Sequence, residues 1–366
     1  MKYYKLTLET LSPVHIGSGD SIGKMEFVNS KKDKRVYVID QAKLFKYLNK
    51  YALLNSYESL LNTYSKNASL DALIIDHNID YRKVKKWAKY SYEANNIGNP
   101  KNIDLFMRDN YSCPYIPGSS VKGALRTVLL NYIISNEETL PQTRSLMEIA
   151  DNKPSDMKEM LSKIGTDVED SITHTISKRD KKDALSDCFA GLRVSDSKPL
   201  SNDDIILCQK IDRLPRGDLN KKRIINKLPI FIECLKPGTT IEFDISVDER
   251  LFKYTISDIR AAMKYMDRNI CEKFLCRFFN AKSQEDTLFL GGKAGYITKT
   301  FTYSMLKRPY AVRLISAFLE GEFIEHRHNE DVHNYKVSPH TEKTTYYNNE
   351  RYDIGMCRAS FKEMKY

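Results

Sequence analysis

Hydrophobic and polar residues alternate at the start of the chain, and this period of two is typical of a strand with one buried face. The alternation recurs before residue 40, around a charged turn at 30–34. Asp40 then precedes a run with helical spacing and is expected to cap it. The elements expected in the first hundred residues are strands at 3–11, 24–28 and 35–39, a helix to about 54, and helical, polar sequence at 56–100.

Helical periodicity marks two longer helices farther along the chain. The first is expected to start at Ser119 or Ser120 and to continue to about residue 134. Residues 135–186 are polar with little sustained periodicity, which predicts an inserted or protruding segment that is partly mobile. The second helix is expected at 257–279, with one apolar stripe formed by Ile259, Met263, Met266, Ile270, Phe274 and Phe278.

A hairpin is the clearest β signal in the second half of the chain. Pro237 and Gly238 occupy the second and third positions of a type II turn, where glycine supplies the positive φ. The turn is expected to join paired strands at 229–235 and 240–247. Further strands are expected at 189–195, 205–211, 288–290 and 353–361, and a basic loop near 216–227. The recurrence of a strand, a helix and a strand pair predicts an α+β fold with two ferredoxin-like sheets packed together.

Composition narrows the classes of partner. Lysine and arginine outnumber aspartate and glutamate by 58 to 48, and the formal charge of +10 favours a polyanion over an acidic protein or a neutral metabolite. The 23 tyrosines could stack on bases, although most are expected to pack in the core. Seven scattered cysteines without a CxxC pair predict neither a disulfide framework nor a zinc ribbon. With no signal peptide and no long apolar run, we expect a cytoplasmic protein without a membrane partner.

Residues 114–127 have the composition of an anion-binding helix start. The first amides of a helix lack internal partners, and Ser119 or Ser120 could cap the helix or share the site. Lys122 and Arg126 fall on one helix face, and Gly123 between them would let a backbone approach closely. This pattern suits a phosphodiester. The alternative is a capped surface helix with two solvated cations.

Residues 291–300 follow the same logic, because three glycines leave the backbone uncovered and Lys293 and Lys299 add charge. Tyr296 could stack on a base. The segment is not a P-loop, since no glycine lies five residues before Gly292 and Ala294 occupies the Ser/Thr position. Nucleotide hydrolysis is therefore not expected. The alternative to RNA binding is a tight turn between a strand and a helix.

Few residues suggest catalysis or metal binding. His15 could be a general acid or base, but no partner is evident nearby, so a structural hydrogen-bonding role is the alternative. Asp196 ends a strand without a paired carboxylate, which favours a capping role. Histidines 326, 328, 333 and 340 crowd one polar stretch without cysteines or a regular helix to align them. No metal site and no cofactor are therefore expected.

Four segments occur in a specific order: Leu11-Ser-Pro-Val-His-Ile-Gly-Ser-Gly19, Tyr115-Ile-Pro-Gly-Ser-Ser-Val-Lys-Gly-Ala-Leu-Arg126, Leu192-Arg-Val-Ser-Asp-Ser-Lys-Pro199 and Leu290-Gly-Gly-Lys-Ala-Gly-Tyr296. As a set they resemble the RAMP proteins of CRISPR systems, and most closely the family of fifth subunits of type III-A Csm effector complexes. The resemblance implies two RRM-like domains with helical and loop insertions. We expect these domains at residues 1–200, with insertions at about 50–100 and 135–185, and at 201–366.

The resemblance also implies a function and a set of partners. Such a subunit caps a filament of related backbone subunits around the 3′ part of the CRISPR RNA (crRNA), and contacts to phosphate suit guides that differ in sequence. The partners expected are crRNA, target RNA indirectly, the adjacent backbone RAMP subunit and the small helical subunit. The residues expected to bind RNA are His15, Gly17, Ser119, Ser120, Lys122, Gly123, Arg126, Gly291, Gly292, Lys293, Gly295, Tyr296 and Lys299.

One departure from the family bears on catalysis. The related backbone subunit cuts target RNA with an aspartate shortly after its His-Ile-Gly loop, whereas Glu26 or a neighbour takes that place here. A misplacement of about 1 Å can cost about 100-fold in rate. We therefore expect a non-catalytic subunit, needed for assembly and crRNA maturation. The alternatives are a metal-independent RAMP endoribonuclease that uses His15 to process precursor crRNA, and a scaffold without RNA contact.

Overall fold

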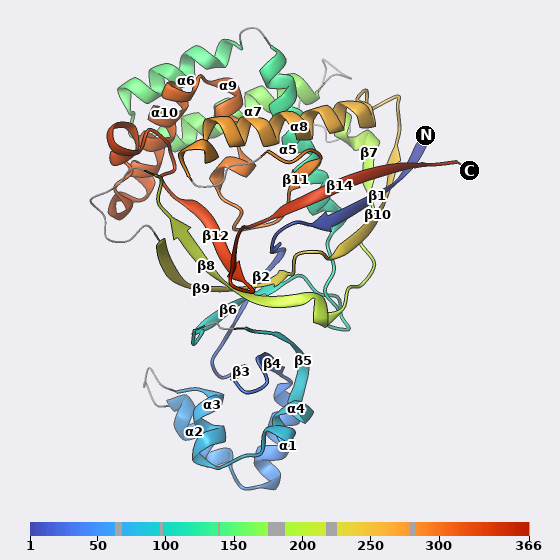
Figure 1. Ribbon diagram of the computed structural model, residues 1–366, viewed down its shortest axis with the longest axis vertical. Coiled ribbons are helices and arrows are strands. Elements are labelled where there is room, and N and C mark those ends of the chain that lie inside the picture. Colours follow the sequence, from blue (N-terminus) through green and yellow to red (C-terminus); the bar gives the residue numbers. More distant parts are fainter. Residues whose placement is uncertain are drawn as a thin grey trace.

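The computed structural model describes residues 1–62, 68–95, 98–137, 140–174, 187–216, 225–278 and 283–365. They form a larger body, which carries both chain ends, and a smaller lobe below it in Figure 1. No helix within these ranges is long and apolar enough to cross a membrane.

The first sheet of the body is assembled from strands that lie far apart in the sequence. Its order is β11 (Thr287–Phe289), β14 (Met356–Met364), β1 (Lys2–Thr10), β10 (Thr240–Val247) and β7 (Leu192–Val194). All neighbouring pairs are antiparallel. Helices α5 (Gly118–Asn136) and α8 (Ile256–Lys273) pack against each other above this sheet (Figure 1). The order β14-β1-β10-β7, with one helix after β1 and one after β10, is ferredoxin-like.

The apolar stripe predicted for the second helix is confirmed, since all six of its residues are buried. Thr255 caps α8, because its hydroxyl accepts a hydrogen bond from the Asp258 amide at 3.2 Å and the Asp258 carboxylate accepts one from the Thr255 amide at 2.7 Å. The α-helix ends at Lys273, and a 3₁₀ turn, Leu275–Arg277, carries the stripe on to Phe278. The stripe therefore joins α8 to the hydrophobic core of the body.

The second sheet has mixed pairing, with β5 parallel to β8 and β6 parallel to β9. It runs β2 (Gly17–Gly23), β6 (Asn102–Phe106), β9 (Ile225–Leu235), β8 (Ile205–Arg213), β5 (Ala88–Glu93), β4 (Arg35–Ile39) and β3 (Phe27–Ser30). Off this path, β12 (Glu342–Tyr347) pairs with β8 and with β13 (Glu350–Asp353). The predicted α+β class with two packed sheets is confirmed. The first sheet crosses the expected boundary at residue 200, because β1 lies between β10 and β14.

The predicted hairpin at 229–247 is wrong. The turn exists, and Gly238 has a φ of 86° as expected, but β9 pairs with β8 and β6 whereas β10 pairs with β1 and β7. The backbone of Thr10 explains the separation, since its carbonyl oxygen accepts a hydrogen bond from the Gly238 amide at 2.7 Å. The Thr10 hydroxyl donates to the Lys236 carbonyl at 2.7 Å. The turn is therefore fastened to the end of β1 and passes the chain from one sheet to the other.

The smaller lobe combines β3, β4 and β5 with four short helices, α1 (Gln41–Lys50), α2 (Leu54–Asn62), α3 (Leu70–Asp76) and α4 (Tyr81–Trp87). It has its own apolar core, to which Leu44, Leu48 and Trp87 belong. Asp40 caps α1 as predicted, accepting from the Lys43 amide at 3.2 Å. The expectation of helical sequence throughout 56–100 is wrong for β5, whose alternating buried residues were hidden among polar ones.

The expectation of an irregular segment at 135–186 is also wrong for its described part. Helices α6 (Pro141–Asn152) and α7 (Met157–Thr173) cover most of it. Several of their apolar residues, such as Leu146, Ile149 and Val168, are buried, and α6 packs against α10 (Arg308–Glu322). Tertiary packing thus stabilises helices whose local pattern is weak. Residues 175–186, like most of the predicted basic loop near 216–227, lie outside the described residues.

Candidate nucleic-acid interface

A groove of about 570 Å³ brings together the first glycine loop, the start of α5 and the late glycine loop. Its lining residues are His15, Ile16, Gly17, Gly19, Asp20, Ser21, Asp104, Leu105, Ser120, Gly291, Gly292, Lys293 and Lys299. Seven residues of the expected RNA-binding set lie on it, namely His15, Gly17, Ser120, Gly291, Gly292, Lys293 and Lys299. The other six, Ser119, Lys122, Gly123, Arg126, Gly295 and Tyr296, are not among its lining residues.

His15 connects the two glycine loops through its backbone. Its carbonyl oxygen accepts a hydrogen bond from the Gly292 amide at 2.8 Å, so this amide is used inside the protein. The His15 ring is 3% exposed, and its Nδ1 lies 2.7 Å from the Glu233 carbonyl oxygen, to which it donates. Burial lowers the pKa of the His15 imidazole. The ring is therefore a neutral wall of the groove, in agreement with the structural alternative considered for it.

Gly291 is required where the loops meet, whereas Gly17 is only tightly placed there. Gly291 has a φ of 84°, and a Cβ there would lie 2.2 Å from the His15 carbonyl oxygen. A Cβ on Gly17 would lie 3.0 Å from His15 Nε2. Gly292 differs, because its φ is ordinary and a Cβ would make ordinary contacts, 3.6 Å from the edge of the His15 ring and 3.9 Å from the His15 carbonyl oxygen. Gly292 thus leaves space at the bottom of the groove, although its backbone conformation does not require a glycine.

Ser119 and Ser120 do not cap α5, contrary to expectation. The helix begins one residue earlier, at Gly118, with Pro117 as the cap residue and no side-chain cap. The Gly118 amide donates instead to the Asp196 carboxylate at 2.8 Å. Asp196 therefore caps a helix, which supports its predicted non-catalytic role. The first amide of α5 already has an anionic partner, and Ser120 from the first turn faces the groove.

Arg126 lies between two carboxylates. Its guanidinium is 2.5 Å from both the Glu169 and the Asp187 carboxylate and lies over the Phe189 ring, 4.7 Å from the centroid. Glu169 belongs to α7, so this cluster fastens α7 and the segment before β7 to α5. Lys122 is partly buried on the same helix, and burial lowers the pKa of its ammonium. Gly123 is exposed, and no atom of the described residues lies within 4 Å of an added Cβ.

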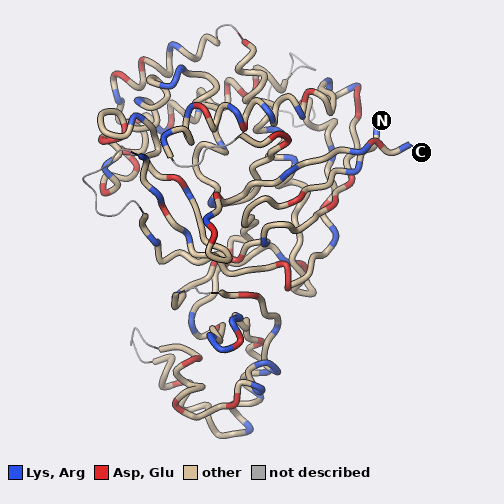
Figure 2. Tube along the Cα trace, in the orientation of Figure 1, with Lys and Arg blue, Asp and Glu red and all other residues tan. Residues whose placement is uncertain are grey.

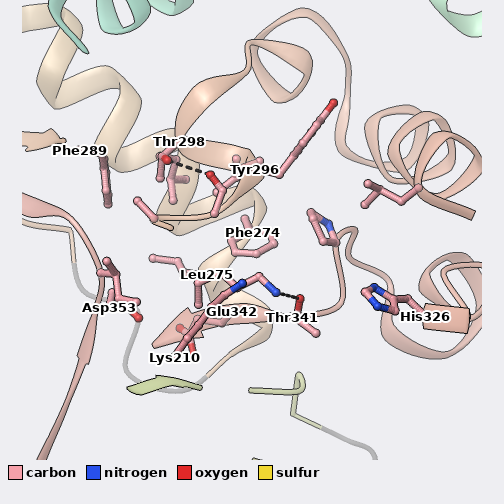
Figure 3. Close-up of a pocket in the computed structure, with 18 of the residues that line it drawn as sticks. Lys210, Phe274, Leu275, Phe289, Tyr296, Thr298, His326, Thr341, Glu342 and Asp353 are labelled. Carbon is pink, nitrogen blue, oxygen red and sulfur yellow. Dashed lines mark hydrogen bonds between the residues drawn. The ribbon is translucent and has the colours of Figure 1, made fainter. Parts of the chain in front are cut away.

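Residues of the late glycine loop line two separate cavities. Residues 291–293 line the groove, whereas residues 294–298 line a separate cavity of about 380 Å³, shown in Figure 3. Tyr296 is partly buried against the hydrophobic core of the body, so its ring does not face the groove. Gly295 has a φ of 97° and begins the 3₁₀ turn Tyr296–Lys299. This turn brings Lys299 to the groove, where the surrounding protein lowers the pKa of its ammonium.

Charge in the groove is mixed. Lys293 forms an ion pair with Asp104 at 3.0 Å, and both side chains are 36% exposed. Asp20 adds a second carboxylate. Figure 2 shows the same mixture of positive and negative residues over most of the body. Positive and negative residues are therefore interspersed along the described chain, and the groove itself is not uniformly basic.

Sequence reasoning missed the wall that β6 contributes, including Asp104 and Leu105. It also missed Glu233, which is fully buried beside His15 and accepts hydrogen bonds from the Phe106 amide at 2.9 Å and from Arg108 at 3.2 Å. The signal available was a lone acidic residue within the apolar run 230–235, since buried charges are usually paired. Glu233 holds β6 against β9 and so positions the groove wall.

Glu26 is not among the residues that line the groove. Its carboxylate accepts a hydrogen bond from the Gly23 amide at 2.8 Å and closes the turn between β2 and β3. Its observed contact is therefore that of a turn residue.

The chain is similar to known proteins over nearly its whole length. It is 25% identical to "CRISPR system Cms protein Csm5" of Enterococcus italicus, over 88% of this chain and 86% of that protein. It is 28% identical to the protein of the same name from Streptococcus thermophilus, over 81% of this chain and 79% of that protein.

A solved structure shares the fold. One chain of a cryo-EM structure of a Csm–crRNA–target RNA ternary complex of a type III-A CRISPR-Cas system has a TM-score of 0.67 and 18% identity, covering 98% of this chain and all of that one. The model of the RAMP superfamily matches residues 7–296, which include both glycine loops and the start of α5. The chain therefore belongs to the RAMP superfamily, as the order of its four motifs predicted.

Proposed function

We propose that this chain is a non-catalytic, crRNA-binding subunit that caps the backbone filament of a type III-A Csm complex near the 3′ part of the crRNA. The similarity to curated Csm5 proteins and to a subunit of a Csm complex supports a role as a Csm subunit. Its neighbours would be the adjacent backbone RAMP subunit and the small helical subunit, and target RNA would be met only through the guide. In that position it serves assembly and crRNA maturation.

The groove between the two glycine loops is the observation that carries this proposal. Glycines 17, 291 and 292 leave its floor without side chains, so a ribose-phosphate chain can approach the protein backbone closely. Ser120, Lys293 and Lys299 supply a hydroxyl and two ammonium groups, which suit phosphate oxygens. Among the described residues that line the groove, the buried His15 has the only aromatic ring. The groove is therefore suited to binding a backbone and not to stacking on bases.

Lys293 can exchange its partner Asp104 for a phosphate group with little loss of free energy. Its ion pair with Asp104 is partly exposed, and such pairs contribute about 0–1 kcal/mol. A phosphate entering the groove can therefore take the ammonium from Asp104. Arg126 is different, because a phosphate would have to displace two carboxylates from a guanidinium that fastens α7. We therefore assign the phosphate contacts to Lys293 and Lys299, with Lys122, Ser119 and Gly123 on the adjoining face of α5.

The test is a double variant, Lys293→Ala/Lys299→Ala, in a reconstituted complex. We expect weaker crRNA retention for every guide sequence and a salt dependence that is shallower by about two units, because each lost phosphate contact removes about one. A variant with the same change in charge, Lys46→Ala/Lys50→Ala on α1, is the control. If both double variants retain crRNA equally well, the groove does not bind the RNA. RNA crosslinks from the assembled particle that spare both glycine loops would do the same.

The endoribonuclease alternative is tested separately. Purified chain is incubated with labelled repeat RNA in EDTA, beside the variant His15→Ala. We expect the RNA to stay intact with both proteins, since His15 donates from Nδ1 to a backbone carbonyl and is nearly inaccessible. Cleavage by the wild type that His15→Ala abolishes would replace the non-catalytic proposal with the endoribonuclease.

A further inference from the structure

Three polar residues with metal-binding side chains meet in the interior, away from the groove. They belong to the segment between α10 and β12, which contains a short π-helix, Asp331–Tyr335. His328, Asp331 and His340 are 4%, 0% and 9% exposed. Sequence reasoning expected no metal site because no regular helix aligns these histidines. The fold aligns His328 and His340 nonetheless, by curling the segment around Asp331.

The geometry points to a common centre. His328 Nδ1 lies 3.1 Å from one oxygen of the Asp331 carboxylate, and His340 Nδ1 lies 2.5 Å from the other. One potential ligand atom of each residue lies within 4.8 Å of the others. The two imidazole rings are tilted by 47°, with centroids 4.7 Å apart. Two imidazoles on one tetrahedral zinc ion, with bonds of about 2.0–2.1 Å, would have centroids about 5 Å apart.

Ser338 is a second, independent observation. Its side chain is fully buried, and its hydroxyl oxygen has no hydrogen-bond partner among the described residues. A buried hydroxyl without a partner costs free energy, so one that is retained calls for an explanation. This hydroxyl lies beside Asp331.

We propose that His328, Asp331 and His340 bind one Zn²⁺ ion, with Ser338 or a water molecule held by it near the fourth position. Imidazole nitrogen and carboxylate oxygen suit zinc, whereas Mg²⁺ and Ca²⁺ take oxygen ligands. Without the ion, each Nδ1–H donates to the carboxylate. With the ion bound, each imidazole carries its proton on Nε2, and bonds from Nδ1 to zinc replace the two hydrogen bonds. The ligands need to separate by only about 1 Å to reach tetrahedral spacing.

The ion would fasten three elements together. The His328 carbonyl oxygen accepts a hydrogen bond from the Ser316 hydroxyl of α10 at 2.7 Å, and His340 lies two residues before β12. The same segment forms one wall of the 380 Å³ cavity, where Figure 3 shows His326 and Thr341. The site is therefore structural, shaping the wall of that cavity. It is independent of the RNA groove, so either proposal can fail alone.

Metal content tests the proposal directly. The full chain, purified with a tag that contains no histidine, is freed of loosely bound ions and measured by mass spectrometry, then titrated with Zn²⁺ against a chromophoric chelator. We expect one zinc ion per chain in the wild type and in His333→Gln, whose side chain is exposed in the same segment. We expect loss of the ion in His328→Gln and in His340→Gln. A wild type that neither retains nor binds zinc, or binding unchanged in both variants, would refute the site.

The melting temperature of the wild type tests the site even if the histidine variants do not fold. EDTA should lower the melting temperature, and added Zn²⁺, but not Mg²⁺, should restore it, because an ion bound only to the folded state stabilises it. Cobalt in place of zinc should give the visible absorption of a tetrahedral site. A melting temperature that is the same with EDTA and with Zn²⁺ would show that His328, Asp331 and His340 form a hydrogen-bond network only.

Discussion

The late glycine loop and the face of α5 that carries Arg126 look alike in sequence, since each places cations beside glycine after a turn. In the structure they differ. Lys293 is partly exposed and pairs with one carboxylate at a groove whose floor is glycine. Arg126 lies between Glu169 and Asp187 and over an aromatic ring. The same pattern thus yields a candidate ligand site in one region and a structural clamp in the other.

Arg126 differs from Lys293 because its two carboxylate partners lie far from it in the sequence and could not be identified from the local pattern. Glu169 lies 43 residues from Arg126, in the segment 135–186 that was expected to be irregular, and Asp187 lies 61 residues away, just beyond that segment. A cation in a motif is available to a ligand only if the fold does not neutralise it first. Variants that separate stability from RNA retention therefore test the comparison directly.

The largest effect is expected within the late loop itself. Gly291→Ala should lower the free energy of unfolding by about 3 kcal/mol, because its Cβ would collide with the His15 carbonyl at a positive φ. Gly292→Ala should change it by less than about 0.5 kcal/mol and yet weaken RNA retention, since the methyl group raises the groove floor. Denaturant unfolding and crRNA retention measure the two. Retention that is unaffected by Gly292→Ala would mean that RNA does not touch this floor.

On α5, Arg126→Ala should cost about 2 kcal/mol of stability, because it leaves two partly buried carboxylates uncompensated. Lys122→Ala, one turn away, should cost less than about 0.5 kcal/mol. Unfolding by denaturant compares them. If the Arg126→Ala protein is as stable as the wild type but loses crRNA, Arg126 is a phosphate ligand. Arg126 and Lys293 would then have the same role.

A smaller gain in affinity is expected from Asp104→Asn. Removing the carboxylate that competes for Lys293 should tighten crRNA binding about two- to threefold at low salt and less at high salt. Asp244→Asn, which breaks the ion pair with Lys5 on the first sheet, is the matched control for net charge. If both variants tighten binding equally, the effect belongs to overall charge and not to the groove.

A small effect of the opposite sign on stability is expected from Gly123→Ala, which should stabilise the protein by about 0.5–1 kcal/mol because alanine is the better helix former and no described atom lies close to the added methyl group. Thermal unfolding measures the gain. If the RNA backbone is bound by the groove alone, crRNA retention stays unchanged. A loss would show that RNA also contacts the face of α5 that carries Ser119, Lys122 and Gly123.

Local sequence patterns were sufficient where a single element contains its own signal. The stripe from Ile259 to Phe278 predicted α8, and the glycines at 291 and 292 predicted a site where backbones approach closely. Patterns failed where the deciding partner is distant. Pro237 and Gly238 predicted a turn correctly, but only the end of β1, more than two hundred residues away, determines that the flanking strands join different sheets. Asp104 was missed because β6 is short and partly polar. Glu233, on β9, was missed because its hydrogen-bond partners Phe106 and Arg108 lie more than a hundred residues away.

The placement of β1 between β10 and β14 has a consequence for biosynthesis. A nascent chain exposes both hydrogen-bonding edges of its first strand until residues 240–247 and then 356–364 leave the ribosome. Pairings this distant in sequence close slowly, and open strand edges invite association with other chains. A product that stops near residue 350 would keep one edge of β1 unpaired along its length. Premature termination should therefore yield an aggregating protein and not a shortened, working one.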